Sequence, residues 1–139
     1  MKQIKQLFSV NNATVSTDVA LLLLRVGFGV LMLTHGIPKF QMLFSGEPVQ
    51  FLPLFGLSAT ASMALAATAE VGGSLLLIFG LGTRLAVIPL IFTMLVAVFV
   101  AHASDPLAVK EPAIHFLIVY FALLFAGSGR YSIDKLLKL

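Results

Sequence analysis

Apolar residues in this chain gather in four long runs, separated by short stretches that are polar or contain proline and glycine. We place these runs at about 18–37, 58–79, 84–103 and 111–127. Each is close to the ~20 residues that an α-helix needs to cross the hydrocarbon core of a bilayer. The pattern therefore predicts an all-α integral membrane protein, folded as a four-helix transmembrane bundle.

Composition agrees with this pattern. Hydrophobic residues make up 59% of the chain and charged residues 11%, whereas soluble domains carry about 25% charged residues. We expect a multi-pass protein of the inner (cytoplasmic) membrane, with the lipid bilayer as its main surroundings. Cysteine is absent, which excludes disulfides and thiolate metal sites within this chain. The net charge of +3 needs no nucleic-acid partner, since membrane proteins concentrate basic residues in cytoplasmic loops.

The chain divides into a polar N-terminal tail, residues 1–17, and a single four-helix domain, residues 18–137. The connector Pro38–Leu57 is rich in phenylalanine and leucine, so we expect it to lie at the membrane interface as short amphipathic pieces. The glycine-rich stretch 80–83 predicts a tight turn that joins the second and third spans as an antiparallel hairpin.

Basic residues outside the spans indicate the topology, because they are enriched in cytoplasmic loops. One side of the predicted bundle carries Lys2, Lys5, Arg84, Arg130, Lys135 and Lys138, and the other carries Lys39 and Lys110. This bias predicts that both termini and the 80–83 turn are cytoplasmic.

Two charged residues lie inside predicted spans, where hydrocarbon offers them no partner. Arg25 lies about 8 residues from the inner end of the first span, and Glu70 about 9 residues from the inner end of the second. With a rise of ~1.5 Å per residue, the two depths nearly coincide, so we predict that Arg25 and Glu70 pair. The pair is either a buried salt bridge that fixes the bundle or part of a polar pocket or proton path.

Glycines near these charges favour close packing of the helices. The residues expected to allow it are Gly27, Gly29, Gly36, Gly72 and Gly73.

A second group of polar residues lies near the predicted outer surface. Its members are His35, His102, Glu111 and His115, with Lys39, Asp105 and Lys110 in the adjoining loops. Imidazoles and carboxylates at one depth can exchange protons or orient a ligand. The spacing Glu111-x-x-x-His115 matches neither the zinc-protease motif nor the di-iron pattern. We therefore predict no metal site, with ligation of a metal or haem by His35, His102 and His115 as the alternative.

Several motifs together resemble those of the DoxX family of membrane proteins. They are Leu24-Arg25-Val-Gly27-x-Gly29, His35-Gly36-x-Pro38-Lys39, Glu70-Val-Gly72-Gly73, the turn 80–84, His102, Glu111, and Gly127-x-Gly129-Arg130-Tyr131-Ser132-Ile133-Asp134. Their order and spacing cover residues 18–137, nearly the whole chain. The resemblance implies a four-helix inner-membrane protein related to the membrane subunit of thiosulfate:quinone oxidoreductase and to partners of redox enzymes.

Taken together, these features predict a membrane subunit of a quinone-linked redox or oxidative-stress system. A quinone is its expected cofactor, and a redox protein and a second copy of the chain are its expected partners. Because no cysteine can carry sulfur, a sulfur-transferring role would need a thiol from a partner. Two alternatives stay open: a non-catalytic membrane scaffold that docks an enzyme, and a small-solute carrier or channel that works as a dimer.

Overall fold

The computed structural model describes residues 14–138, and every regular element among them is a helix. The elements are α2 (Thr14–Leu43), α3 (Ala59–Phe79), α4 (Thr83–Val96), a π-helical continuation of α4, η1 (Ala97–Ala101), α5 (Leu107–Ala126) and the short α6 (Ile133–Leu136). Four helical stretches are long and apolar enough to cross a membrane: Val15–Leu43, Ala59–Phe79, Thr83–Ala101 and Leu107–Ala126. The all-α, four-span prediction is confirmed.

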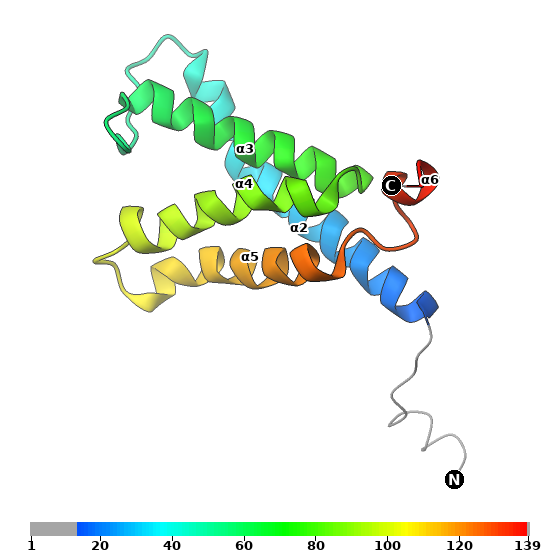
Figure 1. The fold of residues 1–139 in the computed structure, drawn as a ribbon. Coiled ribbons are helices and arrows are strands. Elements are labelled where there is room, and N and C mark those ends of the chain that lie inside the picture. Colours follow the sequence, from blue (N-terminus) through cyan, green and yellow to red (C-terminus); the bar gives the residue numbers. More distant parts are fainter. Residues whose placement is uncertain (1–13, 139) are drawn as a thin grey trace.

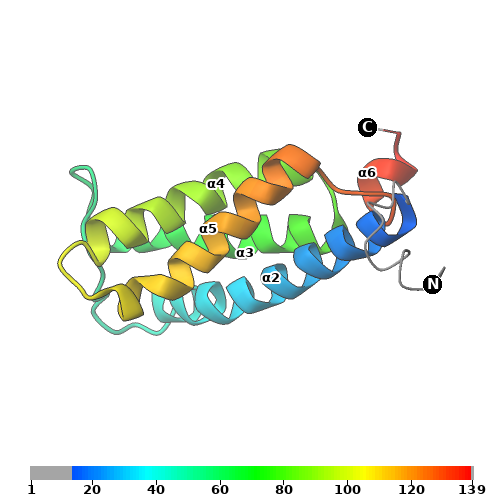
Figure 2. The same ribbon diagram turned by 90° about the horizontal axis from the view of Figure 1, so that it is seen from below.

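The four long helices form an antiparallel bundle in which chain neighbours pack together (Figure 1). Helix α2 packs along most of α3, α3 packs on α4, and α4 packs on α5. Helix α5 also contacts α2, though much less extensively; Figure 2 shows α5 crossing the bundle obliquely. The start of α2, the turn at 80–82 and α6 lie at one end, here named the α6 end. The loops 44–58 and 102–106 lie at the other, the connector end.

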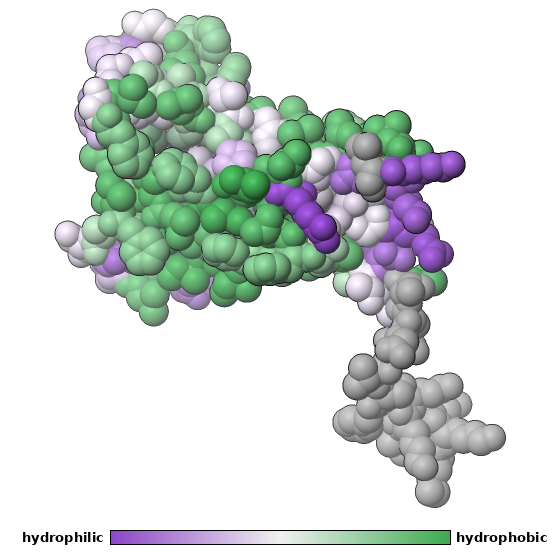
Figure 3. Space-filling model, viewed as in Figure 1, coloured by the Kyte–Doolittle hydropathy of each residue, from purple (hydrophilic) through white to green (hydrophobic). Residues whose placement is uncertain are grey.

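Large apolar side chains occupy both the inside and the outside of this bundle. Inside, Met32, Leu77, Leu90 and Leu123 are fully buried. Outside, every long helix exposes leucine, isoleucine, valine or phenylalanine, and the space-filling view shows an apolar surface over α4 and α5 (Figure 3). Soluble monomers rarely expose apolar patches of this extent. The outer surface therefore suits contact with lipid.

The ends of α3 follow from local chemistry. The Ser58 hydroxyl accepts a hydrogen bond from the Ala61 N–H and caps the N-terminus. Gly80 ends the helix with a φ of 66°, and its N–H donates to the last carbonyls. The predicted second span, 58–79, and the tight turn after it therefore agree closely with the structure.

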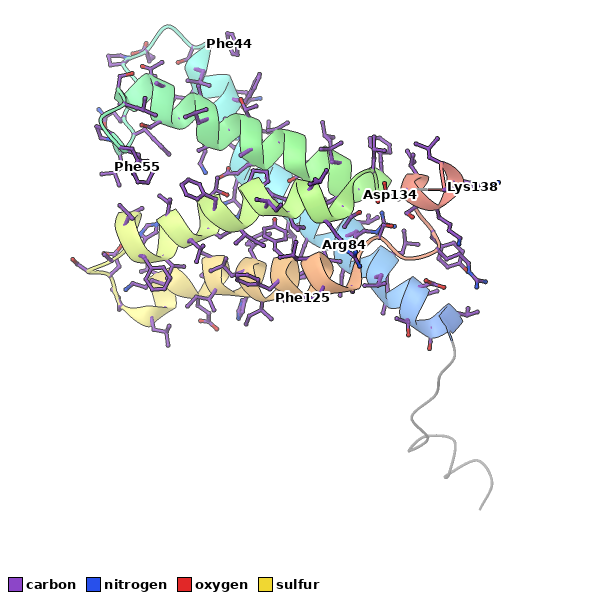
Figure 4. The ribbon with its side chains drawn as sticks, viewed as in Figure 1. Phe44, Phe55, Arg84, Phe125, Asp134 and Lys138 are labelled. Atoms are coloured by element: carbon purple, nitrogen blue, oxygen red, sulfur yellow. The ribbon has the colours of Figure 1, made fainter. Side chains whose placement is uncertain are left out.

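The first span differs from its predicted bounds of 18–37, since α2 begins at Thr14 and ends at Leu43. Pro38 was expected to end the helix, but it lies inside it; membrane helices tolerate proline when neighbouring helices support the backbone. Of the predicted tail, residues 1–13 lie outside the described residues, and the remainder belongs to α2. The connector contains turns, bends and irregular backbone from residue 44 to 58, with Phe44 and Phe55 exposed (Figure 4).

Three of the five glycines named above lie at close helix contacts. A Cβ at Gly29 would come within 2.7 Å of Ile78, one at Gly36 within 2.9 Å of Val71, and one at Gly73 within 2.8 Å of Leu90. The prediction is wrong for Gly27 and Gly72, because a Cβ at either would meet nothing within 4 Å.

Candidate functional site

A buried ion pair joins the connector-end half of α2 to the middle of α3. The Lys39 Nζ lies 2.5 Å from Glu70 Oε1 and 2.7 Å from Oε2. The Glu70 side chain is 2% exposed and that of Lys39 is 29% exposed. Gly36, three residues before Lys39 on α2, packs against Glu70 and Val71 and lets the two helices approach. The predicted Arg25–Glu70 pair is therefore wrong, because Glu70 pairs with Lys39.

Arg25 instead lies at the α6 end, where it is fully buried. Its Nη1 donates to the Leu77 carbonyl at 3.2 Å, and its Nη2 donates to the Tyr131 carbonyl. A Cβ at Gly80 would collide with this guanidinium, so a glycine is needed there. Arg25 thus satisfies a carbonyl of the last turn of α3 and ties the segment after α5 to the bundle.

The prediction of an Arg25–Glu70 pair assumed that α2 and α3 start at the same level in the membrane. In the structure, α2 extends well beyond the α6 end of α3. Gly36 packs at Glu70 and Gly29 packs at Ser74 and Ile78, so Arg25 lies level with the end of α3. Leu77, its partner, is seven residues beyond Glu70, or about 10 Å along the helix.

Asp134 extends this network, and no role was predicted for it from the sequence. Its Oδ1 accepts from the Gly82 N–H at 2.6 Å and its Oδ2 from the Thr83 N–H at 3.3 Å, at the start of α4. The Arg84 Nη2 donates to the Phe125 carbonyl at 3.1 Å, near the end of α5 (Figure 4). Asp134 belonged to a quoted motif, but nothing in its spacing indicated that it would cap a distant helix.

The polar residues at the connector end do not form one cluster. His102 Nδ1 lies 2.7 Å from Asp105 Oδ2, whereas His115 Nε2 lies 3.6 Å from Glu111 Oε1. Within residues 14–138, no three histidine, cysteine, aspartate or glutamate side chains come together in a way that could hold a metal ion. The alternative ligand set, His35 with His102 and His115, is therefore not assembled.

Two of these histidines, His35 and His115, line one groove of about 480 Å³ between α2 and α5. It is lined by Phe28, Leu31, His35, Pro112, His115, Phe116, Ile118 and Val119. The Phe116 ring lies edge-on to both Phe28, with centroids 5.5 Å apart, and His35, at 5.8 Å. Phe28 and Phe116 were not among the site residues predicted from the sequence. The spacing of Phe28, Leu31 and His35 on one helix face could have indicated the α2 wall.

The groove combines a mostly apolar lining with two exposed imidazoles. Small-molecule sites commonly have this character, with a few polar groups that fix the orientation of an apolar ligand. Hydrocarbon would give these imidazoles no hydrogen-bond partner. An apolar molecule with hydrogen-bonding oxygens would supply one. His115 Nε2 also lies 3.6 Å from the Glu111 carboxylate, with which it could exchange a proton.

Comparison with known proteins decides the family. The model of the DoxX family matches residues 20–103. The chain belongs to the DoxX family. The predicted resemblance is thus confirmed, and the protein is a multi-pass membrane protein of this family. The matched range includes Arg25, Lys39 and Glu70 but ends before α5, which forms one wall of the groove.

A relative in Bacillus subtilis (strain 168) is named "Putative oxidoreductase CatD". It is 32% identical to this DoxX family chain over 91 residues, which is 66% of each chain. The match thus spans just under two thirds of the relative's own length. No solved structure matches this chain.

Proposed function

We propose that this DoxX family protein is the membrane subunit of a quinone-linked redox system, and that the groove between α2 and α5 receives the quinone ring. The observation that carries the proposal is the pair of imidazoles, His35 and His115, in an otherwise apolar groove that opens between two membrane-spanning helices. The name of the Bacillus subtilis relative supports an oxidoreductase role.

The lining residues fit such a ligand. A quinone ring is flat and apolar, and its two carbonyl oxygens accept hydrogen bonds. The half-buried Phe28 ring can contact such a ligand, and the buried Phe116 ring packs against Phe28 and His35 and supports them. His35 lies on the α2 wall and His115 on the α5 wall, so each wall contributes one hydrogen-bond donor. An isoprenoid tail would leave the groove directly into lipid.

A quinone bound between these residues would supply two-electron, two-proton redox chemistry, with the hydroquinone as its reduced form. The electrons would come from a reduced group on a partner redox protein, and the protons would pass through this chain's own residues. His115 Nε2 lies 3.6 Å from Glu111 Oε1, so a proton could pass between these two side chains. The His115 and Glu111 side chains are more than half exposed, at 60% and 59%, so they can exchange protons with water at the connector end. Under this proposal the protein lies in the cytoplasmic membrane with its α6 end inside.

Purification in mild detergent followed by mass spectrometry of bound small molecules tests the proposal. We expect a co-purified quinone, and we expect His35→Ala and His115→Ala each to reduce its amount per protein about tenfold, as the loss of a ligand hydrogen bond of ~1.4 kcal/mol would. His102→Ala is the matched control, because His102 pairs with Asp105 outside the groove. Quinone that is retained equally in all three variants, or that cannot be bound even when added back, would rule the proposal out.

A second candidate is a non-catalytic scaffold that docks a partner enzyme. Arg25 and Glu70 favour this candidate, because both side chains bind partners within the bundle and hold its helices together. Failure to bind added quinone, combined with co-purification of an intact enzyme, would support the scaffold.

A further inference from the structure

A second hollow lies at the α6 end, between the end of α3 and the C-terminal segment. It has a volume of about 380 Å³ and is lined by Phe79, Arg130, Tyr131, Ser132, Ile133 and Leu136. It lies far along the bundle from the groove between α2 and α5, whose histidines approach the connector end. The proposed function makes no use of it.

The end of the bundle that holds this hollow carries a net positive charge, and one of its basic residues, Arg130, lines the hollow. Among the described residues of the α6 end (14–25, 79–84 and 127–138), the basic residues are Arg25, Arg84, Arg130, Lys135 and Lys138, and the acidic ones are Asp18 and Asp134. Both acids are already engaged. Asp134 accepts from two backbone N–H groups. Asp18 accepts from the Arg130 N–H at 2.9 Å, and its Oδ2 lies 3.6 Å from the Arg130 Nε.

Two lysines at this end have no acidic partner among the described residues. The Lys135 and Lys138 side chains are exposed, and neither forms an ion pair or side-chain hydrogen bond with another of the described residues. Lys138 extends from the end of the C-terminal segment (Figure 4), in the region where Figure 3 shows hydrophilic side chains beside the apolar surface. The charge at this end is therefore not neutralised by the described part of the chain.

An apolar path leads from the outer surface of the bundle to the same place. Leu75 and Phe79 are four residues apart on α3, on one face, and are 44% and 59% exposed. Phe79 forms a wall of the hollow, and Leu136 of α6 forms another while remaining 81% exposed. A molecule with a hydrocarbon chain along α3 would thus place its head among basic side chains.

We propose that this hollow binds the head group of an anionic phospholipid, with an acyl chain along the Leu75–Phe79 face of α3. The unpaired lysine ammonium groups attract the phosphate, while Arg130, which is paired with Asp18, lines the hollow. Apolar side chains on both sides favour a lipid over a free phosphate ion, because a free ion would make no use of Phe79 or Leu136. The short α6, docked by Asp134 and by Arg25 through Tyr131, holds the basic residues at this depth.

Native mass spectrometry of the full chain in detergent tests the proposal. Phosphatidylglycerol and phosphatidylcholine with identical acyl chains are added separately, and the bound fraction is measured at several concentrations. We expect phosphatidylglycerol to bind more tightly, and the double variant K135Q/K138Q to weaken its binding about thirtyfold, given ~1 kcal/mol for each of the two basic residues near an anionic surface. Both lysines are exposed and without ion pairs, so these substitutions leave the fold intact.

Lys110→Gln is the control for loss of a lysine charge at the other end of the bundle, because Lys110 lies at the connector end and donates to the Ala103 carbonyl. It should leave phosphatidylglycerol binding unchanged. Phe79→Ala should weaken the binding of both lipids while keeping the preference for phosphatidylglycerol. Inorganic phosphate should not displace the lipid at millimolar concentration; displacement would show a free-anion site and overturn the proposal. Equal binding of the two lipids, or equal loss in K110Q and K135Q/K138Q, would also overturn it.

Discussion

Lys39 and Glu70 form an ion pair whose two members are unequally buried. The Lys39 Nζ contacts both carboxylate oxygens of Glu70, at 2.5 and 2.7 Å, yet the lysine side chain is 29% exposed and the glutamate 2%. A long lysine side chain can turn its ammonium group toward the interface when its partner is lost, whereas a buried carboxylate cannot move to water. The two halves of the pair should therefore respond differently to substitution.

Lys39→Met should destabilise the bundle by about 3 kcal/mol, because it leaves the buried Glu70 charge without its counter-ion. Glu70→Gln should cost less, since Lys39 can still reach polar surroundings. The double variant should be more stable than Lys39→Met alone. Thermal unfolding in detergent measures all three. A Glu70→Gln variant less stable than Lys39→Met would contradict this ordering.

Two glycines of α2 offer a matched pair for testing helix packing. A methyl group at Gly36 would lie 3.0 Å from Glu70 Cβ and 3.2 Å from the Val71 nitrogen, whereas one at Gly27 would meet nothing within 4 Å. Gly36→Ala should lower stability by about 1–3 kcal/mol through overpacking. Gly27→Ala should be neutral or stabilising by up to ~1 kcal/mol, because alanine favours helix. Equal melting temperatures for the two variants would show that α2 and α3 do not approach at Gly36.

Asp134 should protect the start of α4, because its carboxylate accepts from the Gly82 and Thr83 N–H groups. Asp134→Ala should cost about 1 kcal/mol, as the loss of a capping side chain does. Hydrogen exchange at Gly82 and Thr83 should become faster in this variant. Lys135→Ala, one residue away and exposed, is the control and should leave both amides unchanged. Unaltered exchange in Asp134→Ala would mean that the cap does not form.

The existence of the four spans could be predicted from hydropathy because each run is continuous and close to the thickness of the membrane. The residues at which the helices end were harder to predict. Gly80 ended α3 as predicted, since its positive φ suits glycine. Pro38 did not end α2, because a proline removes one backbone donor but does not prevent the helix from continuing against α3.

The partner of Glu70 could not be predicted from depth alone. The estimate assumed that helices begin at a common level, but the offset between α2 and α3 is set by where Gly29 and Gly36 fit against α3. Lys39 had been assigned to the connector, which hid its position one helical turn beyond Gly36. The carbonyls of Leu77 and Tyr131 that receive Arg25 carry no sequence signal, since every residue has a carbonyl group.

The histidines were identified by residue type, but their grouping required the structure. His35 and His115 line one groove, whereas His102 pairs with Asp105 in its own loop. Sequence gives the approximate depth of each residue but not the side of the helix that meets α5. That side depends on how α5 crosses the bundle (Figure 2).

Labelling with a photoreactive azidoquinone, followed by mapping of the modified peptides, tests the central claim most directly. The proposed groove predicts labels within 28–35 on α2 and 112–119 on α5, competed away by unmodified quinone and strongly reduced in His115→Phe. Competition-sensitive labelling that falls elsewhere on the described helices, or labelling of the groove that unmodified quinone does not reduce, would contradict a quinone site between α2 and α5.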